Sequence, residues 1–303
     1  MLRFALLMVS TLAVTLAVGG ERLANWMSRP IADIDTALFL CANGSDDTWR
    51  LSLVDGEILA DRESSSETMM TNYFATIEGA SYFPLDRSGE APSEVERVSD
   101  GFLVAYNNGE WGGAVVWVSS DFARQYEISR HQVIKFIRKG ADLYALAGLS
   151  HLGISHGELI HFRRSTDGRW TATEVAELRE EPSAHLPIDE DSILVITETQ
   201  LLRVWFDGRV ATLYTGGRGF SPIYSFVRTA DGTLYLASMG TVIRLTPTGT
   251  TYQGEWLFPA SILLNCETRG RKHGELRRFQ AACLSTAAHA ARSGAMRDSR
   301  LRC

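Results

Sequence analysis

Short runs of apolar and β-branched residues, separated by turn-forming residues, follow one another along most of the chain. The clearest stretch is residues 223–256, which contains four such runs, rich in Val, Ile, Leu, Tyr and Thr. These residue types favour pleated, half-buried strands. The pattern predicts a four-stranded antiparallel meander with strands at Ile223–Arg228, Thr233–Ala237, Thr241–Thr246 and Thr250–Glu255.

The same unit recurs upstream. The core of its second strand begins at a leucine, and the four such leucines are 40, 51 and 40 residues apart: Leu103, Leu143, Leu194 and Leu234. The third strand recurs as Val115–Val118, Leu159–Phe162, Leu202–Trp205 and Val242–Leu245. Five Asp-Gly dipeptides, at 55–56, 100–101, 167–168, 207–208 and 231–232, fall between the predicted strands, and this pair tolerates the positive φ of tight hairpins. A period of about 40–50 residues is typical of β-propeller blades.

A partial unit precedes these repeats. Ala37–Cys41, Trp49–Leu53 and Glu57–Leu59 are expected to be strands, which brings the number of predicted blades to five. We also expect Ser261–Leu264 to be a strand beside this unit, because a ring is closed by joining strands from the two chain ends.

Residues 62–98 have two interpretations. Tyr73–Ile77 and Ser81–Leu85 read as a hairpin, and so as part of a sixth blade. The alternative is an elaborate loop. Residues 62–67 and 86–94, which flank the hairpin, are polar and are expected to be loops.

The segment LYLASMGTVIRLTPTG, residues 234–249, resembles the repeats of bacterial propeller domains, including those of sensor-kinase ectodomains. The resemblance covers residues 223–256 well and residues 100–255 loosely. Together with the repeats, it implies an all-β, propeller-like domain of about five to six four-stranded antiparallel blades over residues 31–266. No Trp-Asp dipeptide closes the blades, so the WD40 family is not indicated. No functional residues follow from this resemblance.

The first 20 residues have the form of a secretory signal peptide. Arg3 precedes an apolar run, Phe4–Val18, which ends in small residues. The run is shorter than the roughly 20 residues that a spanning helix needs. The alternatives are an uncleaved anchor or a buried helix. No Cys follows the run, so a lipoprotein anchor is not indicated. We expect export to the periplasm or the extracellular space.

Export permits disulfides. The four cysteines, Cys41, Cys266, Cys283 and Cys303, allow three full pairings. A Cys41–Cys266 bond would join the two ends of the predicted ring. The alternative is that Cys41 is simply a small buried apolar residue.

The charge is distributed unevenly along the chain. The net charge is −6, but residues 267–303 hold nine basic and three acidic side chains, so this tail carries +6 and residues 1–266 carry −12. An acidic body argues against nucleic acid as the partner. The tail is interpreted as disordered or loosely docked, as a weak amphipathic helix over Glu275–Arg292 that binds an anionic membrane or an acidic partner, or as sequence from an altered reading frame.

Two segments between second and third strands carry most of the candidate chemistry. Asn107–Gly113 and Gly148–Gly157 are read as long loops of adjacent blades, which would meet at the mouth of the central channel. The candidate ligand-binding residues are Asn107, Asn108, Glu110, Trp111, His151 and His156. The alternative is structural: the asparagines satisfy turns, Trp111 packs on a neighbouring blade, and the histidines are hydrogen-bonded.

Enzyme and metal motifs are weak. Gly153–Gly157 matches G-x-S-x-G around Ser155, but a β-rich run follows it where a nucleophile elbow requires a helix. His156 and His161 are five residues apart, so they lie on opposite faces of a strand and cannot share a metal ion. No phosphate-binding loop or dinucleotide fingerprint is present, so we expect no cofactor and no metal.

The sequence favours an exported, non-enzymatic protein that binds a small molecule, a glycan or a protein. Membrane contact is expected only through the N-terminal segment or the basic tail. The alternative is an exported hydrolase on the same scaffold, with its active site in 107–113 and 148–157. A structural or partner-binding role without a small ligand is the third interpretation.

Overall fold

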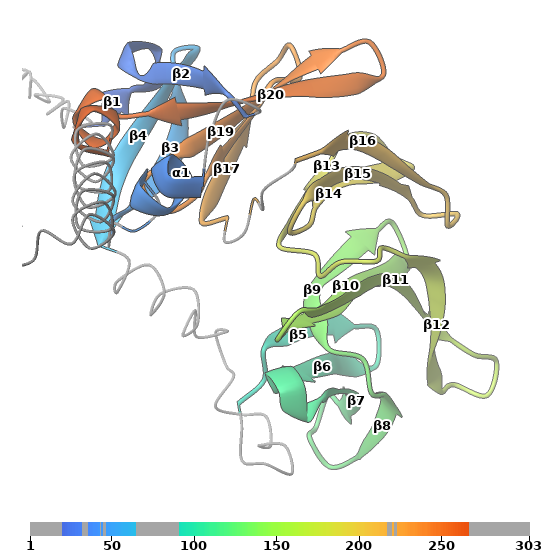
Figure 1. The fold of residues 1–303 in the computed structure, drawn as a ribbon. Coiled ribbons are helices and arrows are strands. Elements are labelled where there is room, and N and C mark those ends of the chain that lie inside the picture. Colours follow the sequence, from blue (N-terminus) through green and yellow to red (C-terminus); the bar gives the residue numbers. More distant parts are fainter. Residues whose placement is uncertain are drawn as a thin grey trace, which may run out of the picture.

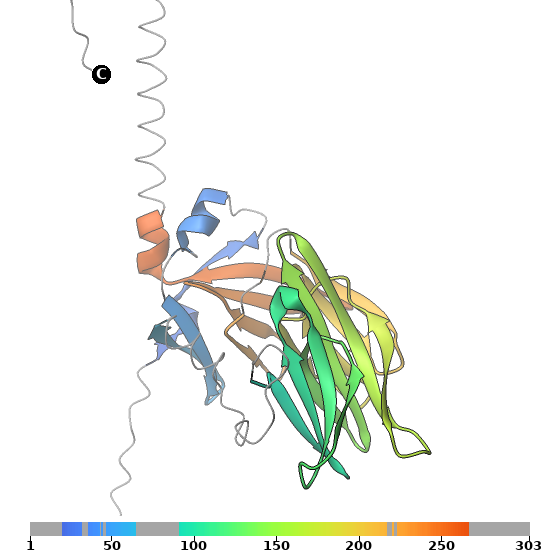
Figure 2. The same ribbon diagram turned by 90° about the horizontal axis from the view of Figure 1, so that it is seen from below.

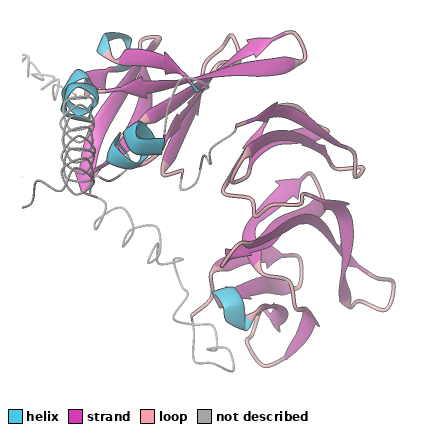
Figure 3. Ribbon diagram, in the orientation of Figure 1, coloured by secondary structure: helices cyan, strands magenta, loops and turns pink. Residues whose placement is uncertain are grey.

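A computed structural model describes residues 20–31, 36–42, 44, 47–64, 91–216, 220 and 223–266. Most of the elements in these ranges are strands (Figure 3). Residues 1–19 of the predicted signal peptide, the predicted hairpin over 73–85 and the basic tail over 267–303 lie outside the described residues. None of the helices in the described ranges is long and apolar enough to cross a membrane.

The described strands form five antiparallel sheets. Three sheets have four strands each in chain order: β5 (Glu94–Val98), β6 (Gly101–Asn107), β7 (Gly113–Ser119) and β8 (Gln125–Ser129); β9 (Val133–Lys139), β10 (Asp142–His151), β11 (Ile154–Arg164) and β12 (Trp170–Glu177); and β13 (Ala184–Pro187), β14 (Ser192–Ile196), β15 (Gln200–Trp205) and β16 (Val210–Thr215). The last sheet contains β17 (Ser225–Arg228), β18 (Leu234–Ala237), β19 (Val242–Thr248), β20 (Thr251–Phe258) and β2 (Met27–Pro30). The first sheet has the order β1 (Glu21–Arg22), β4 (Glu57–Ser64) and β3 (Asp47–Val54).

The predicted meander over residues 223–256 is confirmed as β17 to β20. The leucines that mark the repeat lie in the second strands of their sheets: Leu103 in β6, Leu143 in β10, Leu194 in β14 and Leu234 in β18. The chain is therefore all-β, with several four-stranded antiparallel sheets built from one recurring unit.

The Asp-Gly pairs lie in hairpin turns, as predicted, and three of them share one hydrogen-bond pattern. The carboxylate oxygens of Asp167, Asp207 and Asp231 each accept a hydrogen bond, 3.1 Å long, from the backbone N–H two residues further on. The following glycines have φ of +84°, +97° and +87°. Hydrogen bonds to the ionised carboxylates lower the pKa of these aspartates, with the Thr229 hydroxyl the largest contributor at Asp231.

The sheets follow one another around an arc, arranged like propeller blades (Figure 1). Apolar clusters fill the space between neighbouring sheets. One cluster joins β6 and β7 to β10 and β11, through residues such as Leu103 and Phe162. Others join β10–β11 to β14–β15, β14–β15 to β18–β20, and β18–β20 to β3–β4. Each sheet thus buries side chains on its neighbour, which explains the nearly continuous apolar runs of the second and third strands.

Two predicted strands are wrong. Residues 37–41 belong to a helix, α1 (Thr36–Ala42), and residues 260–266, which include the expected closing strand, are also helical. Pro259 stands at the start of the second helix, where its missing N–H costs nothing, and its carbonyl accepts bonds from Ile262 and Leu263. Short apolar runs do not distinguish a strand from a buried helical turn.

Residues 21–30 connect the first sheet to the last. β1 pairs with β4, and β2 pairs with β20, so one short segment contributes to both sheets. Cys41 of α1 and Cys266 of the second helix form a disulfide, with their Cα atoms 5.7 Å apart. The pairing was predicted from the sequence, although it joins two helices rather than two strands. Figure 2 shows these N-terminal and C-terminal elements side by side.

Candidate ligand-binding site

The two segments that were predicted as loops differ in structure. Asn107 is the last residue of β6, and the short 3-10 helix η4 (Gly109–Trp111) follows it. Residues 148–157 are not a long loop: β10 and β11 continue as a paired hairpin whose turn is only Leu152-Gly153. Both turn residues have positive φ, +49° and +84°, as a two-residue hairpin turn requires.

The two segments meet, as predicted. Glu110 Oε2 lies 2.7 Å from His151 Nε2, which joins η4 to the end of the β10–β11 hairpin. Both side chains are about 41% exposed. Trp111 is 82% exposed. Glu110, Trp111 and His151 thus lie together on the surface.

The two asparagines take part in the turn around η4. Asn107 Oδ1 accepts a hydrogen bond from the Gly109 N–H at 3.1 Å, and the backbone groups of Asn108 bond to Gly112 and Trp111. Gln132 Nε2 donates to the Gly109 carbonyl at 2.6 Å, which ties this turn to the segment between β8 and β9. In the structure, Asn107 and Asn108 shape the loop.

His156 is separate from the Glu110–His151 pair. It lies on β11 opposite Leu149, on the strand face that also carries Glu158. Burial raises the pKa of Glu158 and of Glu181, and the nearby His156 opposes both shifts. His156 therefore lies close to two partly buried glutamates, Glu158 and Glu181.

Ser155 is in a strand and not on a nucleophile elbow. It lies in β11, and its Oγ accepts a hydrogen bond from the Glu181 N–H at 2.9 Å. His161, which was compared with His156 as a possible metal ligand, is buried. Its Nε2 lies 3.0 Å from Asp142, and its Nδ1 accepts a hydrogen bond from Arg163. Within the described ranges, no three His, Cys, Asp or Glu side chains are grouped so that they could hold a metal ion.

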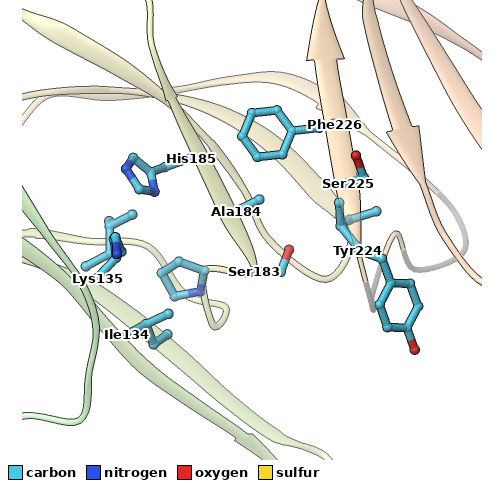
Figure 4. Close-up of a pocket in the computed structure, with 11 residues that line it drawn as sticks. Ile134, Lys135, Ser183, Ala184, His185, Tyr224, Ser225 and Phe226 are labelled. Carbon is cyan, nitrogen blue, oxygen red and sulfur yellow. The ribbon is translucent and has the colours of Figure 1, made fainter. Parts of the chain in front are cut away.

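A cavity of about 430 Å³ lies elsewhere, where β9, β13 and β17 approach one another. Apart from Leu146 of β10, its lining residues come from the first strands of three sheets and from the segments that precede them: Ile134, Lys135, Pro182, Ser183, Ala184, His185, Ile223, Tyr224, Ser225 and Phe226. Figure 4 shows His185 between Lys135 and Phe226, whereas the Tyr224 ring points away from the other labelled side chains.

The polar groups of the cavity are mostly neutralised or already bonded. Lys135 Nζ lies 2.6 Å from Glu94 of the neighbouring β5. Ser225 Oγ accepts a bond from the Leu51 N–H, and Ser183 Oγ donates to the Ile196 carbonyl. His185 has no such bond among those described, so it is the side chain best placed to bond with a ligand.

Comparisons with known proteins add little. No protein-family model matches the chain, and no curated protein matches it. Among solved structures, the chain resembles the extracellular domain of a putative hybrid two-component system from B. thetaiotaomicron, with a TM-score of 0.34 and 11% sequence identity. The match covers 70% of this chain and 26% of that one. The similarity is weak, and neither fold nor function is inferred from it.

Sequence reasoning missed the cavity. Its walls are first strands, such as Ser183-Ala184-His185, which contain no recognised motif. They are brought together only by the packing of three sheets. The one available signal was a histidine at the start of a predicted blade, next to small residues.

His185 leads to a prediction on acid stability. Burial, reinforced by the charge of Lys135, lowers the pKa of His185 below its ordinary value of 6.5. As the pH falls through about 6.5, His185 binds a proton in the unfolded chain but stays neutral in the folded chain. The free energy of unfolding therefore decreases. His185→Gln should therefore lose less stability than the wild type between pH 7.5 and 5 in urea denaturation. Equal losses in both proteins would contradict the assignment.

Proposed function

We propose that this chain is an exported, non-enzymatic binding protein, with a small-molecule site between β9, β13 and β17 of a propeller-like ring. The observation that carries the proposal is the cavity of about 430 Å³ between three sheets. Ligand pockets are commonly about 300–1,000 Å³ in volume, concave and mostly apolar, with a few polar groups that orient the ligand.

Two features support export. The N-terminal segment has the form of a signal peptide. The disulfide between Cys41 and Cys266 belongs to an oxidising compartment, because thiols are kept reduced in most cytosols.

The burial of one sheet face supports a closed ring of five to six blades. Val104, Tyr106 and Val118 lie on sheet β5–β8 and are at most 2% exposed, yet they form a cluster separate from the one facing β9–β12. None of the described sheets packs on this cluster.

The lining of the cavity suggests the class of ligand. Phe226, Ile223 and Ile134 offer an apolar surface, while the neutral His185 ring has one nitrogen that donates a hydrogen bond and one that accepts. The Lys135 charge is balanced by Glu94. A neutral molecule with one apolar face fits this lining better than an ion does, since an added charge would lack a partner.

We do not adopt the hydrolase alternative. Its site would be in 107–113 and 148–157, where Glu110 pairs with the exposed His151 and Ser155 Oγ accepts from a backbone N–H. Nucleophilic catalysis needs a base aligned on the nucleophile, and among the described residues no hydrogen bond joins Ser155 to His151 or His156.

The test is a thermal-shift screen of neutral small molecules, followed by calorimetric titration of each compound that raises the melting temperature. We expect His185→Ala and Phe226→Ala to weaken the binding of a confirmed compound at least tenfold, because each removes a lining group. Trp111→Ala is the matched control and should leave the affinity unchanged. Binding that depends on Trp111 and not on His185 would place the site at the surface loops and reject the proposal.

A further inference from the structure

The β10–β11 hairpin extends beyond its own sheet. The pairing of β10 with β9 ends at Ala147, and the pairing of β11 with β12 ends at Glu158. Residues 148–157 form ladder pairs only with each other, as a two-stranded extension, although the backbone of Gly148 and Gly157 at its base also bonds to Gln132 and Leu178. Figure 2 shows this hairpin end and η4 at the same end of their sheets. The Glu110–His151 contact holds the two together.

Three large apolar side chains are exposed at this end: Trp111 (82%), Leu152 (90%) and Ile154 (68%). We call these three residues the apolar tip. Ile154 is the cross-strand partner of His151, and Trp111 is next to Glu110 in the chain, so the Glu110–His151 contact places the three residues at the same end of their sheets. Single exposed apolar residues are ordinary, but three gathered at one protruding end indicate a binding surface.

Leu152 has a backbone conformation that is unfavourable for a leucine. Its φ of +49° is left-handed, a conformation that a leucine adopts only at a cost and that Asn or Gly would adopt more readily. Its side chain gains almost no burial in return. A strained residue that presents an apolar side chain to the outside suggests a function for that side chain outside the chain itself.

The apolar tip has almost no charge. Residues 148–157 contain no Asp, Glu, Lys or Arg, and Glu110 is the only such residue in 107–113, where it pairs with His151. Moving this end into a medium of low polarity would therefore expose few ions to desolvation. Residues 1–266 together carry −12, which opposes attraction to an anionic surface.

The size and shape of the tip favour a lipid surface over a folded protein. A stable protein interface buries about 800 Å² on each partner, from about 20–30 residues. Three side chains, on a narrow hairpin end and on the neighbouring η4, can bury far less surface area. A lipid interface is deformable and needs no complementary shape: Leu and Ile enter the acyl boundary, and Trp prefers the headgroup level.

From these observations we propose that the apolar tip is a membrane-docking element that inserts Leu152, Ile154 and Trp111 into a zwitterionic phospholipid surface. This contact would be separate from the predicted N-terminal segment and basic tail. The tip is also separate from the cavity between β9, β13 and β17. The membrane-docking proposal and the ligand-site proposal can therefore be rejected independently.

The test uses the full chain with phosphatidylcholine vesicles and compares substitutions within it, so that any contribution of the N-terminal segment is constant. The double variant Leu152→Asp/Ile154→Asp should bind vesicles at least tenfold more weakly than the wild type in a flotation assay. Val210→Asp is the matched control: Val210 is 39% exposed and begins β16, next to the β15–β16 turn at the opposite end of the sheets. It should bind like the wild type.

Trp111 supplies a second readout. Vesicles containing brominated phosphatidylcholine should quench part of the tryptophan fluorescence of the wild type, and Trp111→Phe should lose that part, because bromine quenches only nearby indoles. Equal vesicle binding by the double variant and by Val210→Asp, together with quenching that Trp111→Phe does not change, would overturn the proposal. Binding only to a protein, with none to vesicles, would overturn it as well.

Discussion

Replacing both Cys41 and Cys266 with serine should lower the free energy of unfolding by about 2–5 kcal/mol, the range seen when native disulfides are removed. The bond joins residues separated by 225 positions, and the gain from restricting the unfolded chain grows with loop length. It also holds α1, a helix of seven residues, which is too short to be stable by itself. For a domain of this size, roughly 2–4 °C of melting temperature is lost per kcal/mol.

Calorimetry with and without a reductant checks this prediction. Reductant should lower the melting temperature of the wild type toward that of the double variant and should leave the double variant unchanged. If the double variant melted at the wild-type temperature, the disulfide would not stabilise the fold. If reductant lowered both equally, another bond would be responsible.

The repeat could be predicted because its signal is local. In the meander over 223–256, β-rich runs alternate with turns such as Asp231-Gly232, and each hairpin is closed by residues that are neighbours in sequence. The same holds for the sheets that begin at β5, β9 and β13. Their order and connections follow from counting the repeats.

The chain ends could not be predicted in the same way. Residues 37–41 are apolar and as compatible with a strand as with the helix they form. β2 lies near the predicted leader and pairs with β20, more than 220 residues away, so no local pattern indicates this partner. The disulfide could be predicted because two of four cysteines flank the repeats.

At the candidate site in the two loop segments, the repeat pattern predicts which residues lie near each other but not what each side chain does. The repeat register predicted that 107–113 and 148–157 meet, and Glu110 and His151 do so. It did not show that 148–157 is a hairpin, because Gly148 and Gly157 suggest a loop when their neighbours are unknown. In the structure these glycines are opposite each other, and the segment after β12 crosses over them.

That crossing leads to the second large effect, in Gly157→Ala. A Cβ at Gly157 would lie 2.1 Å from the Glu180 carbonyl oxygen and 2.8 Å from Pro182 Cδ, closer than real Cβ atoms come. The backbone of 178–182 must then move, and the bond from the Leu178 N–H to the Gly157 carbonyl is weakened. We expect the free energy of unfolding to fall by about 2–4 kcal/mol, at the upper end of overpacking effects.

The same substitution should disturb the cavity. Pro182, which lines the cavity, ends the displaced segment, and His185 follows three residues later. Gly153→Ala is the control: its φ is +84° but nothing lies within 4 Å of the added Cβ, so only backbone strain of about 1 kcal/mol is expected. Urea denaturation of both variants, monitored by tryptophan fluorescence, separates the two costs. Equal losses would mean that the segment from Leu178 to Pro182 adapts freely. In that case, the packing of this segment against Gly157 would not determine the position of His185 in the cavity.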